Sequence, residues 1–324
     1  MKPKENFILA LEGKQPFGRV PHFELVFYLT MEAFGKVHPT HRCFSQWDQM
    51  SDNEKQFHRK DIVDTYLQIA KTYEHSAIFY QCEDIWQEKV NDETLRILEM
   101  LRGKSNDEYL LMIHGDRTWD IPDGNRMMDF VTQMAEKPDE LKSEAQRMID
   151  VALENAIIYK NSGVLDCFAL CSDYCFNTNP FFSPEMFNEF VTPYLKQLVS
   201  GYKELGFYVI KHTDGNIMPI LDQIVSAKPH ALHSLDPQGN VDIAEVKKLI
   251  GDQICLIGNV NCGLMDTGTD KEIIESAKYA LEYGMPSGGF IFSTSNCIYT
   301  GMPLRSYDLI LDVWRKYGIY NVDD

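Results

Sequence analysis

The sequence has no long apolar run, and this absence sets the first limit on what the protein can be. Hydrophobic residues make up 44% of its 324 residues, but they are scattered in short groups. None of these groups reaches the ~18 consecutive apolar residues that a membrane-spanning helix needs. The N-terminal stretch that begins Met1-Lys2-Pro3-Lys4 is followed by only a short apolar patch, so we expect no signal peptide. The sequence therefore predicts a cytoplasmic protein with no membrane partner.

Positive charge is also scarce. The chain has 31 Lys and Arg residues against 48 Asp and Glu residues, which gives a formal net charge of -17 at pH 7. A chain this acidic repels phosphate backbones, so we expect no nucleic-acid partner. Its eight cysteines lie in a long chain without an export signal. We interpret them as free thiols of a reducing compartment, some buried and one or more available to bind a metal.

Eight short apolar runs alternate with helical patterns along the chain. Most runs are rich in Ile, Val, Phe and Leu without strict alternation, which is typical of parallel strands buried on both faces. Eight strand–helix units predict an α/β fold, a (β/α)8 TIM barrel formed by a single domain over residues 1–324. An open doubly wound sheet is the alternative, but no Gly-x-Gly-x-x-Gly follows the first run. The runs span residues 20–27, 77–84, 110–116, 163–173, 208–214, 231–236, 254–261 and 289–295.

Helix signals lie in the gaps between these runs. The gap at 29–73 is longer than one crossover helix needs, so we expect an N-terminal helical cap insertion there. Ser183-Pro184 predicts a helix start, with Ser as the N-cap and Pro at the first helical position. Thr269 and Glu272 have the spacing of a capping box, which predicts a second helix start.

Reactive side chains follow the apolar runs, at the ends where a barrel carries its catalytic groups. His212 and Asp214 are two residues apart at the end of one run, so both should face the same side of the strand. Such a pair can chelate one metal, and Cys297, just beyond the last run, could close the site. One nitrogen, one oxygen and one sulfur suit zinc, with a fourth position left open as in catalytic sites. The alternative is a histidine bonded to its neighbour and a plain free cysteine.

Further candidates lie at the ends of the other runs. Carboxylates and a phenol there could position a substrate or move a proton, and aromatic side chains could line a pocket for a flat or apolar substrate. The predicted catalytic residues are Glu83, Asp84, Tyr174 and His212, and the predicted substrate-binding residues are Glu24, Trp86, Asp173 and Asn259.

Several segments form a recognisable pattern: Ser183-Pro184-Glu185, His212-Thr213-Asp214-Gly215-Asn216, Ile257-Gly258-Asn259-Val260, Gly288-Gly289-Phe290-Ile291-Phe292-Ser293 and Tyr317-Gly318-Ile319-Tyr320. Together they resemble the uroporphyrinogen decarboxylase superfamily, in its branch of corrinoid-dependent methyltransferases. The resemblance covers most of the chain and is strongest in its last third. It implies the (β/α)8 barrel, in agreement with the eight runs.

The resemblance also implies a zinc site. The methyltransferase branch typically binds zinc through His-x-Cys on the fifth strand and a Cys after the eighth, and this chain has His212 and Cys297 at the matching positions. Asp214 stands where the middle Cys is expected. Zinc accepts carboxylate ligands, but a site with an oxygen ligand is better suited to polarising an ether, amine or hydroxyl oxygen than to activating a thiol. Asp236 or Glu83 could provide a fourth contact.

The implied reaction moves a methyl group from a small methylated substrate to cobalt. The corrinoid-carrier motif Asp-x-His-x-x-Gly is absent, so the cobalt should arrive on a separate corrinoid protein. We favour a methyl ether as the donor, because aromatic residues near the predicted mouth suit such substrates.

Two other functions compete with methyl transfer. One is a metal-free decarboxylase or lyase acting on a small carboxylated substrate, with Asp84, Tyr174 and His212 as acid and base groups. A porphyrinogen substrate is disfavoured, because only Arg19 stands where uroporphyrinogen decarboxylases carry paired arginines for the substrate carboxylates. The other is a non-catalytic binding barrel, which the ring of reactive residues disfavours.

Overall fold

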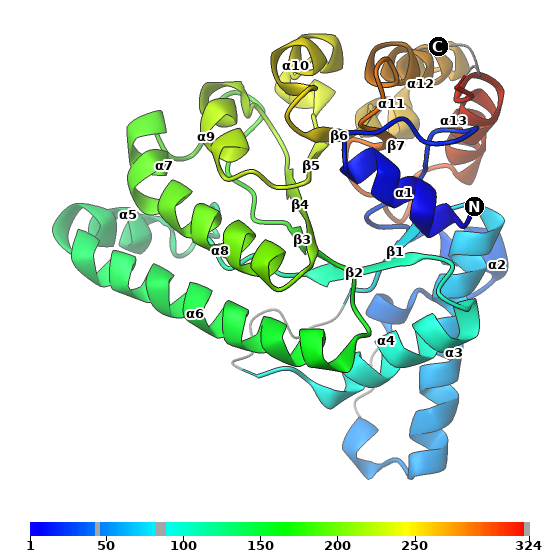
Figure 1. Cartoon of the computed structure of the whole chain (residues 1–324), viewed down its shortest axis with the longest axis horizontal. Helices are drawn as coiled ribbons and strands as arrows, with labels where there is room; N and C mark the ends of the chain where they lie inside the picture. The colour runs from blue at the N-terminus through cyan, green and yellow to red at the C-terminus, as the bar shows by residue number, and fades with distance from the viewer. Residues whose placement is uncertain (43–45, 82–88, 321–324) are drawn as a thin grey trace.

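The computed structural model describes residues 1–42, 46–81 and 89–320. Its centre is one parallel sheet of seven strands, in which the order across the sheet is the order along the chain. Helices lie outside the strands, and helix α1 crosses the sheet at its N-terminal side (Figure 1). This is an α/β fold of the TIM-barrel-like kind. None of the helices in the described ranges combines the length and apolarity that crossing a bilayer requires.

The elements follow the predicted alternation of strand and helix. The strands are β1 (Ala77–Phe79), β2 (Leu110–His114), β3 (Cys167–Leu170), β4 (Tyr208–Thr213), β5 (Ala231–Ser234), β6 (Cys255–Val260) and β7 (Phe290–Thr294). The α-helices are α1 (Pro3–Leu11), α2 (Thr30–Phe34), α3 (Asp52–Thr72), α4 (Asp92–Ser105), α5 (Met127–Glu136), α6 (Pro138–Ser162), α7 (Pro184–Phe190), α8 (Thr192–Glu204), α9 (Leu221–Ser226), α10 (Ile243–Ile250), α11 (Cys262–Thr267), α12 (Asp270–Gly284) and α13 (Leu304–Tyr317). The short 3-10 helices are η1 (Pro39–His41), η2 (Trp47–Gln49), η4 (Met218–Ile220) and η5 (Pro237–Gly239).

The first predicted strand, at 20–27, is not confirmed as a strand, and the described sheet has seven strands where eight were expected. The segment instead makes isolated parallel bridges, one between His22 and Phe292 on β7 and another further along. On its other side, Ser76 N donates to His22 O over 2.7 Å, next to β1. Pro21 has no N–H to donate, which limits the ladder this segment can form. The segment therefore bridges β7 and the start of β1 without becoming a regular strand.

Helices α2 and α3 and the turns η1 and η2 occupy the long gap predicted to hold a helical cap. Helix α3 begins at a capping box in which Ser51 and Glu54 satisfy each other's backbone N–H groups. Figure 1 shows α3 beside α4. The two helix starts predicted from sequence also form, at Ser183 before α7 and at Thr269 before α12. A covering role for the helices in the gap stays a prediction.

Side-chain alternation on β4 decides which residues reach the interior of the barrel. Ile210 packs in the cluster of small and medium apolar residues enclosed by the strands and capped by Phe7 of α1. Val209 packs in the outer cluster, between the sheet and the helices. Because successive side chains point to opposite faces, His212 shares the inner face with Ile210, and Lys211 shares the outer face with Val209. Helix α1 fills the N-terminal end of this interior, so His212 lies toward the opposite, C-terminal end.

Candidate active site

The C-terminal ends of β3 and β4 bring three potential metal ligands together. Asp173 follows β3, His212 lies on β4 and Asp214 is the first residue after β4. One ligand atom from each residue lies within 4.8 Å of the other two. His212 is buried, and the two aspartates are partly exposed. Among the described residues this is the group whose donor atoms are close enough to share one ion.

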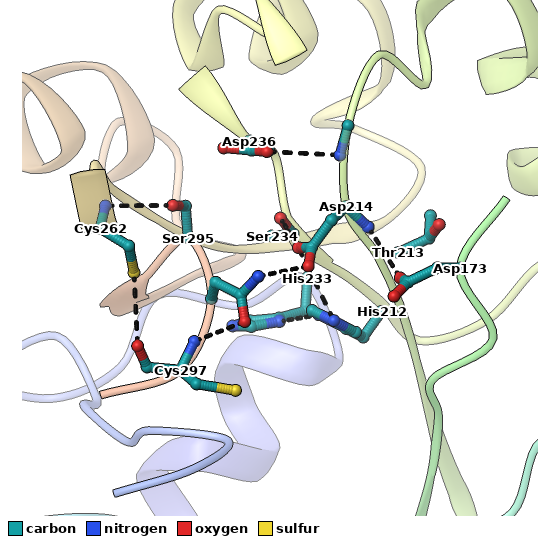
Figure 2. Close-up of polar contacts among 12 residues, drawn as sticks. Asp173, His212, Thr213, Asp214, His233, Ser234, Asp236, Cys262, Ser295 and Cys297 are labelled. Carbon is teal, nitrogen blue, oxygen red and sulfur yellow. Dashed lines mark hydrogen bonds and ion pairs between the residues drawn. The ribbon is translucent and has the colours of Figure 1, made fainter. Parts of the chain in front are cut away.

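Asp214 is held in place by hydrogen bonds to both of its carboxylate oxygens. Ser234 Oγ donates to Oδ1 over 2.7 Å, and the side-chain amide of Asn296 donates to Oδ2 (Figure 2). The backbone N–H of Asp214 donates to Asp173 Oδ1 over 3.1 Å, which ties the two aspartates together. Burial raises the pKa of Asp214, and the nearby His212 works in the opposite direction. Each carboxylate oxygen has a second lone pair, so these bonds leave acceptor capacity for a cation.

His212 is oriented by a second histidine. Its Nδ1 lies 2.6 Å from Nδ1 of His233, the residue that pairs with it across β4 and β5. The contact leaves Nε2 of His212 facing Asp214, whose Oδ1 is 3.7 Å away. His233 is fully buried, and burial lowers the pKa of its imidazole well below the usual value. His233 is therefore neutral near pH 7, and the His212–His233 contact is a hydrogen bond between two rings.

The loop after β4 is packed tightly against two neighbouring loops. Gly215 has a φ of +76°, and a Cβ there would come within 2.6 Å of Phe176 O. Asp236 Oδ2 accepts from Gly215 N over 3.3 Å, and burial raises the pKa of Asp236. Gly239 packs directly on the same backbone: its Cβ would come within 2.6 Å of Asn216 N and closer still to Gly215. The position of Asp214 therefore depends on glycine at 215 and 239.

We expect Gly239→Ala to displace the loop that carries Asp214. The added methyl group would meet backbone atoms, which cannot rotate away as a side chain can, so the free energy of unfolding should fall by about 1–3 kcal/mol. Urea unfolding measures this change. Gly124→Ala is the matched control, because a Cβ at Gly124 meets nothing within 4 Å. Equal stability of the two variants would show that the loop has room that the structure does not suggest.

Cys297 does not belong to the three-residue group, although Asn296 bonds to both Asp214 and Cys297. Its backbone N–H donates to Asn296 Oδ1 over 2.6 Å, and its carbonyl oxygen accepts from Cys262 Sγ over 3.7 Å. Figure 2 shows the Cys262 sulfur directed at this carbonyl oxygen and the Cys297 sulfur pointing away from Cys262. Burial raises the pKa of the Cys297 thiol to about 12, and the neighbouring Cys262 and Asp214 add to the effect. The predicted ligands His212 and Asp214 are thus joined by Asp173, and a ligand role for Cys297 stays a prediction.

Two other predicted site residues are completely enclosed. Glu24 has a fully buried side chain, and its Oε2 accepts from Ser293 Oγ and from Thr294 N, each over 3.1 Å. The hydroxyl of Tyr174 is 2.6 Å from Thr118 Oγ1, and its ring packs in the outer apolar layer, away from the barrel interior. Both side chains therefore lie behind the surface that a substrate would meet, and their predicted roles stay predictions.

The remaining predicted site residues are Asn259, Glu83, Asp84 and Trp86. Asn259 is buried at the end of β6, and its amide donates to Leu235 O over 3.0 Å. Glu83, Asp84 and Trp86 lie outside the described residues. Sequence reasoning missed Ser234 and Asn296 as the residues that hold Asp214. Since neither serine nor asparagine is a typical ligand, only their position next to the predicted metal site could have drawn attention to them.

The donor chemistry of Asp173, His212 and Asp214 fits a divalent metal ion. Zinc binds both imidazole nitrogen and carboxylate oxygen, and two acidic ligands would neutralise its charge. Without a thiolate, such a set also suits other divalent ions that prefer nitrogen and oxygen. The position at the C-terminal ends of parallel strands is where barrels of this kind place their catalytic groups.

The fold and this group of residues together define a TIM-barrel-like α/β protein with a candidate metal centre at the barrel mouth. Residues 123–317, more than half of the chain, match the sequence model of the family described as uroporphyrinogen decarboxylase (URO-D). The chain belongs to this family, which is a family of enzymes. No curated protein matches the sequence.

Solved structures support the fold. A methyltransferase from Methanosarcina mazei superimposes with a TM-score of 0.72 at 17% identity, over 98% of this chain and 99% of that one. A GH5_18 protein from Bifidobacterium longum subsp. infantis gives a TM-score of 0.52 at 10% identity, over 93% of this chain and 80% of the other. At these identities the similarity is one of fold.

Proposed function

We propose that the protein is a methyltransferase that moves a methyl group from a small methylated substrate to the cobalt of a separate corrinoid protein, with a divalent metal, zinc first, as Lewis acid. The observation that carries the proposal is the Asp173–His212–Asp214 group at the ends of β3 and β4. Membership of the URO-D family and the fold shared with a methyltransferase from Methanosarcina mazei support it. A methyl ether remains the favoured donor.

The charges around the site favour this function over decarboxylation. A carboxylated substrate needs cationic side chains, but the described group offers two aspartates, with Asp236 close by. Arg19 lies on the other side of the molecule, where it pairs with Glu74 over 3.2 Å and stacks over the Trp314 ring. It therefore points away from the mouth and cannot hold a substrate carboxylate there.

A metal held by these ligands would polarise the heteroatom that carries the methyl group and so improve it as a leaving group. The chain's own residues prepare the site, because Ser234 and Asn296 fix the orientation of the Asp214 carboxylate. In the transfer the carbon–heteroatom bond breaks and a carbon–cobalt bond forms with the electron pair of Co(I). The leaving group keeps the electrons of the broken bond and takes up one proton, for which Glu83 and Asp84 are the proposed donors.

We also propose that the helices in the gap after the first segment cap the mouth. The ring of Tyr28, just before α2, packs edge-on against His38 and at a tilt against His41, with ring centroids 5.0 and 4.4 Å apart. The hydroxyl of Tyr28 accepts from Gln81 Nε2 over 2.9 Å, close to the end of β1. These contacts anchor the gap segment at the C-terminal end of a barrel strand, where a cap would exclude water and help bind a flat donor.

Metal removal tests the proposed function. We expect chelator-treated protein to transfer methyl groups at least about 100-fold more slowly, because Lewis-acid stabilisation of the transition state is worth several kcal/mol. One equivalent of zinc should restore the rate. The assay mixes protein, a reduced corrinoid protein and a panel of methyl ethers, and follows methyl–cobalt absorbance. Undiminished transfer by metal-free protein would refute the Lewis-acid role, and carbon dioxide release from a carboxylated substrate, without methyl transfer, would favour the decarboxylase.

A further inference from the structure

A line of hydrogen-bonded side chains leads from His212 into the closed interior of the barrel. Nδ1 of His212 lies 2.6 Å from Nδ1 of His233, and Nε2 of His233 lies 3.3 Å from Oγ of Ser293. Ser293 Oγ donates to Glu24 Oε2 over 3.1 Å. All four residues are buried, and they come from β4, β5, β7 and the segment before β1. The first contact of this line is drawn in Figure 2.

Each neutral histidine in this line carries one N–H and Ser293 carries one O–H, so the donors can be arranged in two orders. A neutral imidazole has one N–H donor and one acceptor nitrogen, and a metal-binding histidine is neutral. In the first order, His212 carries its proton on Nδ1 and donates it to His233 Nδ1. His233 then carries its proton on Nε2 and donates to Ser293, whose hydroxyl donates to Glu24. Nε2 of His212 is left with a free lone pair on the side of Asp214.

The second order reverses the two bonds made by His233, breaks the bond from Ser293 to Glu24, and fits the surroundings less well. It places the proton of His212 on Nε2, where Asp214 Oδ1 at 3.7 Å is too far to accept it. It also turns the hydroxyl of Ser293 toward His233, so that Oε2 of the buried Glu24 carboxylate loses one of three donors and keeps those from Thr294 N and Thr294 Oγ1. The backbone N–H of Thr294 can only donate, and it reaches the same Oε2 over 3.1 Å, which marks that oxygen as an acceptor. A buried acceptor deprived of a hydrogen bond is costly, so Glu24 favours the first order.

We propose that Glu24, Ser293 and His233 are positioning residues that hold His212 in the tautomer with its proton on Nδ1 and its Nε2 lone pair available to a metal. The proposal rests on the proposed function, because it takes His212 as a metal ligand. It also gives Glu24 a role that acts through the histidines, in place of the substrate contact predicted from sequence. Partners of this kind around a metal-binding histidine typically change metal affinity by 10–100-fold.

Ser293→Ala tests the proposal, because it removes one hydroxyl from the middle of the line. We expect zinc to bind the variant 10–100-fold more weakly than the wild type, as measured by competition with a chromophoric chelator. Ser295→Ala is the matched control: Ser295 is also fully buried, two residues further along, but its Oγ accepts from Cys262 N instead. Ser295→Ala should bind zinc as the wild type does. Unchanged affinity in Ser293→Ala, or an equal loss in both variants, would overturn the proposal.

The tautomer itself can be observed without metal. In metal-free protein with ¹⁵N-labelled histidine, NMR should show His212 protonated on Nδ1, with the signal assigned by its loss in His212→Gln. Glu24→Leu should shift His212 toward the Nε2–H form, because it removes the acceptor that turns the Ser293 hydroxyl away from His233 Nε2. A wild-type His212 protonated on Nε2 would refute the proposal. If the wild type binds no zinc, the metal-dependent function fails, and the NMR result still decides the role of these three residues.

Discussion

Replacing His212 with alanine should lower kcat/KM for methyl transfer by at least about 10³ and abolish tight metal binding. His212 supplies the nitrogen donor of the Asp173–His212–Asp214 group, so the variant would leave two carboxylates that hold a divalent ion weakly. Loss of a Lewis acid worth several kcal/mol corresponds to a factor of this size. Metal content of the purified variant and the methyl–cobalt assay measure the two effects together. Addition of excess zinc should restore little of the activity.

The control for this variant is His230→Ala. His230 directly precedes β5, and its Nδ1 accepts from Val209 N over 3.0 Å, at the opposite end of the barrel from His212. The His230→Ala variant should keep the wild-type metal content and rate of methyl transfer. The metal content and rate of Asp214→Asn and Asp173→Asn should lie between those of His212→Ala and His230→Ala. Each of these variants retains an oxygen ligand but loses a charge. Full activity and full metal content in His212→Ala would show that the metal, if it acts, binds elsewhere.

The parts of the site that share one strand could be predicted from sequence. His212 and Asp214 are two residues apart, and the period of a strand is enough to place them on one face. Asp173 comes from the neighbouring strand, so its place depends on register. Leu170 pairs with Lys211, and continuing this register places Asp173 beside Asp214, as their hydrogen bond confirms. That register is set by the packing of the whole barrel, and the sequence does not specify it.

Two further residues, His233 and Cys297, occupy positions that also depend on register or on a loop. His233 pairs directly with His212 across two strands, a relation that appears only once β4 and β5 are in register. Cys297 lies beyond β7 in a loop whose course depends on hydrogen bonds such as that between Cys297 N and Asn296. The two-residue period of a strand does not extend into such a loop, so it does not place Cys297. Seven of the eight predicted strands form the described sheet, whereas the run that contains Pro21 makes only isolated bridges.

The largest effect on stability is expected at Lys211, next to His212 but on the other face of β4. Lys211 Nζ donates to Asp116 over 2.8 Å and to Ser172 O over 2.8 Å, and both side chains of the ion pair are fully buried. Burial acts to raise the pKa of Asp116, but Lys211 and the hydrogen bonds from Thr118 outweigh it and hold that pKa at about 2. Lys211→Met would leave this carboxylate buried without its cation. Removing one partner of a buried ion pair costs about 3–5 kcal/mol.

Urea unfolding at pH 7 should therefore show Lys211→Met less stable than the wild type by this amount. The double variant Lys211→Met/Asp116→Asn should recover part of the loss, because no charge stays buried.

The difference in the free energy of unfolding between wild type and Lys211→Met should also narrow in acid. In the wild type, Asp116 has a lowered pKa, so its stabilising contribution is present above its ordinary value of 3.8 and is lost as the pH falls toward about 2. In the variant, burial without a cation should place that pKa above 3.8, so the penalty is relieved at higher pH, as the pH falls through the raised pKa toward 3.8. Lys203→Met is the control, because Lys203 is exposed on α8 and its Nζ donates to a backbone oxygen, Lys228 O, not to a buried carboxylate. Its replacement should change the free energy of unfolding by less than about 0.5 kcal/mol. Equal stability of the two methionine variants at pH 7 would mean that water or another cation reaches Asp116 once Lys211 is gone.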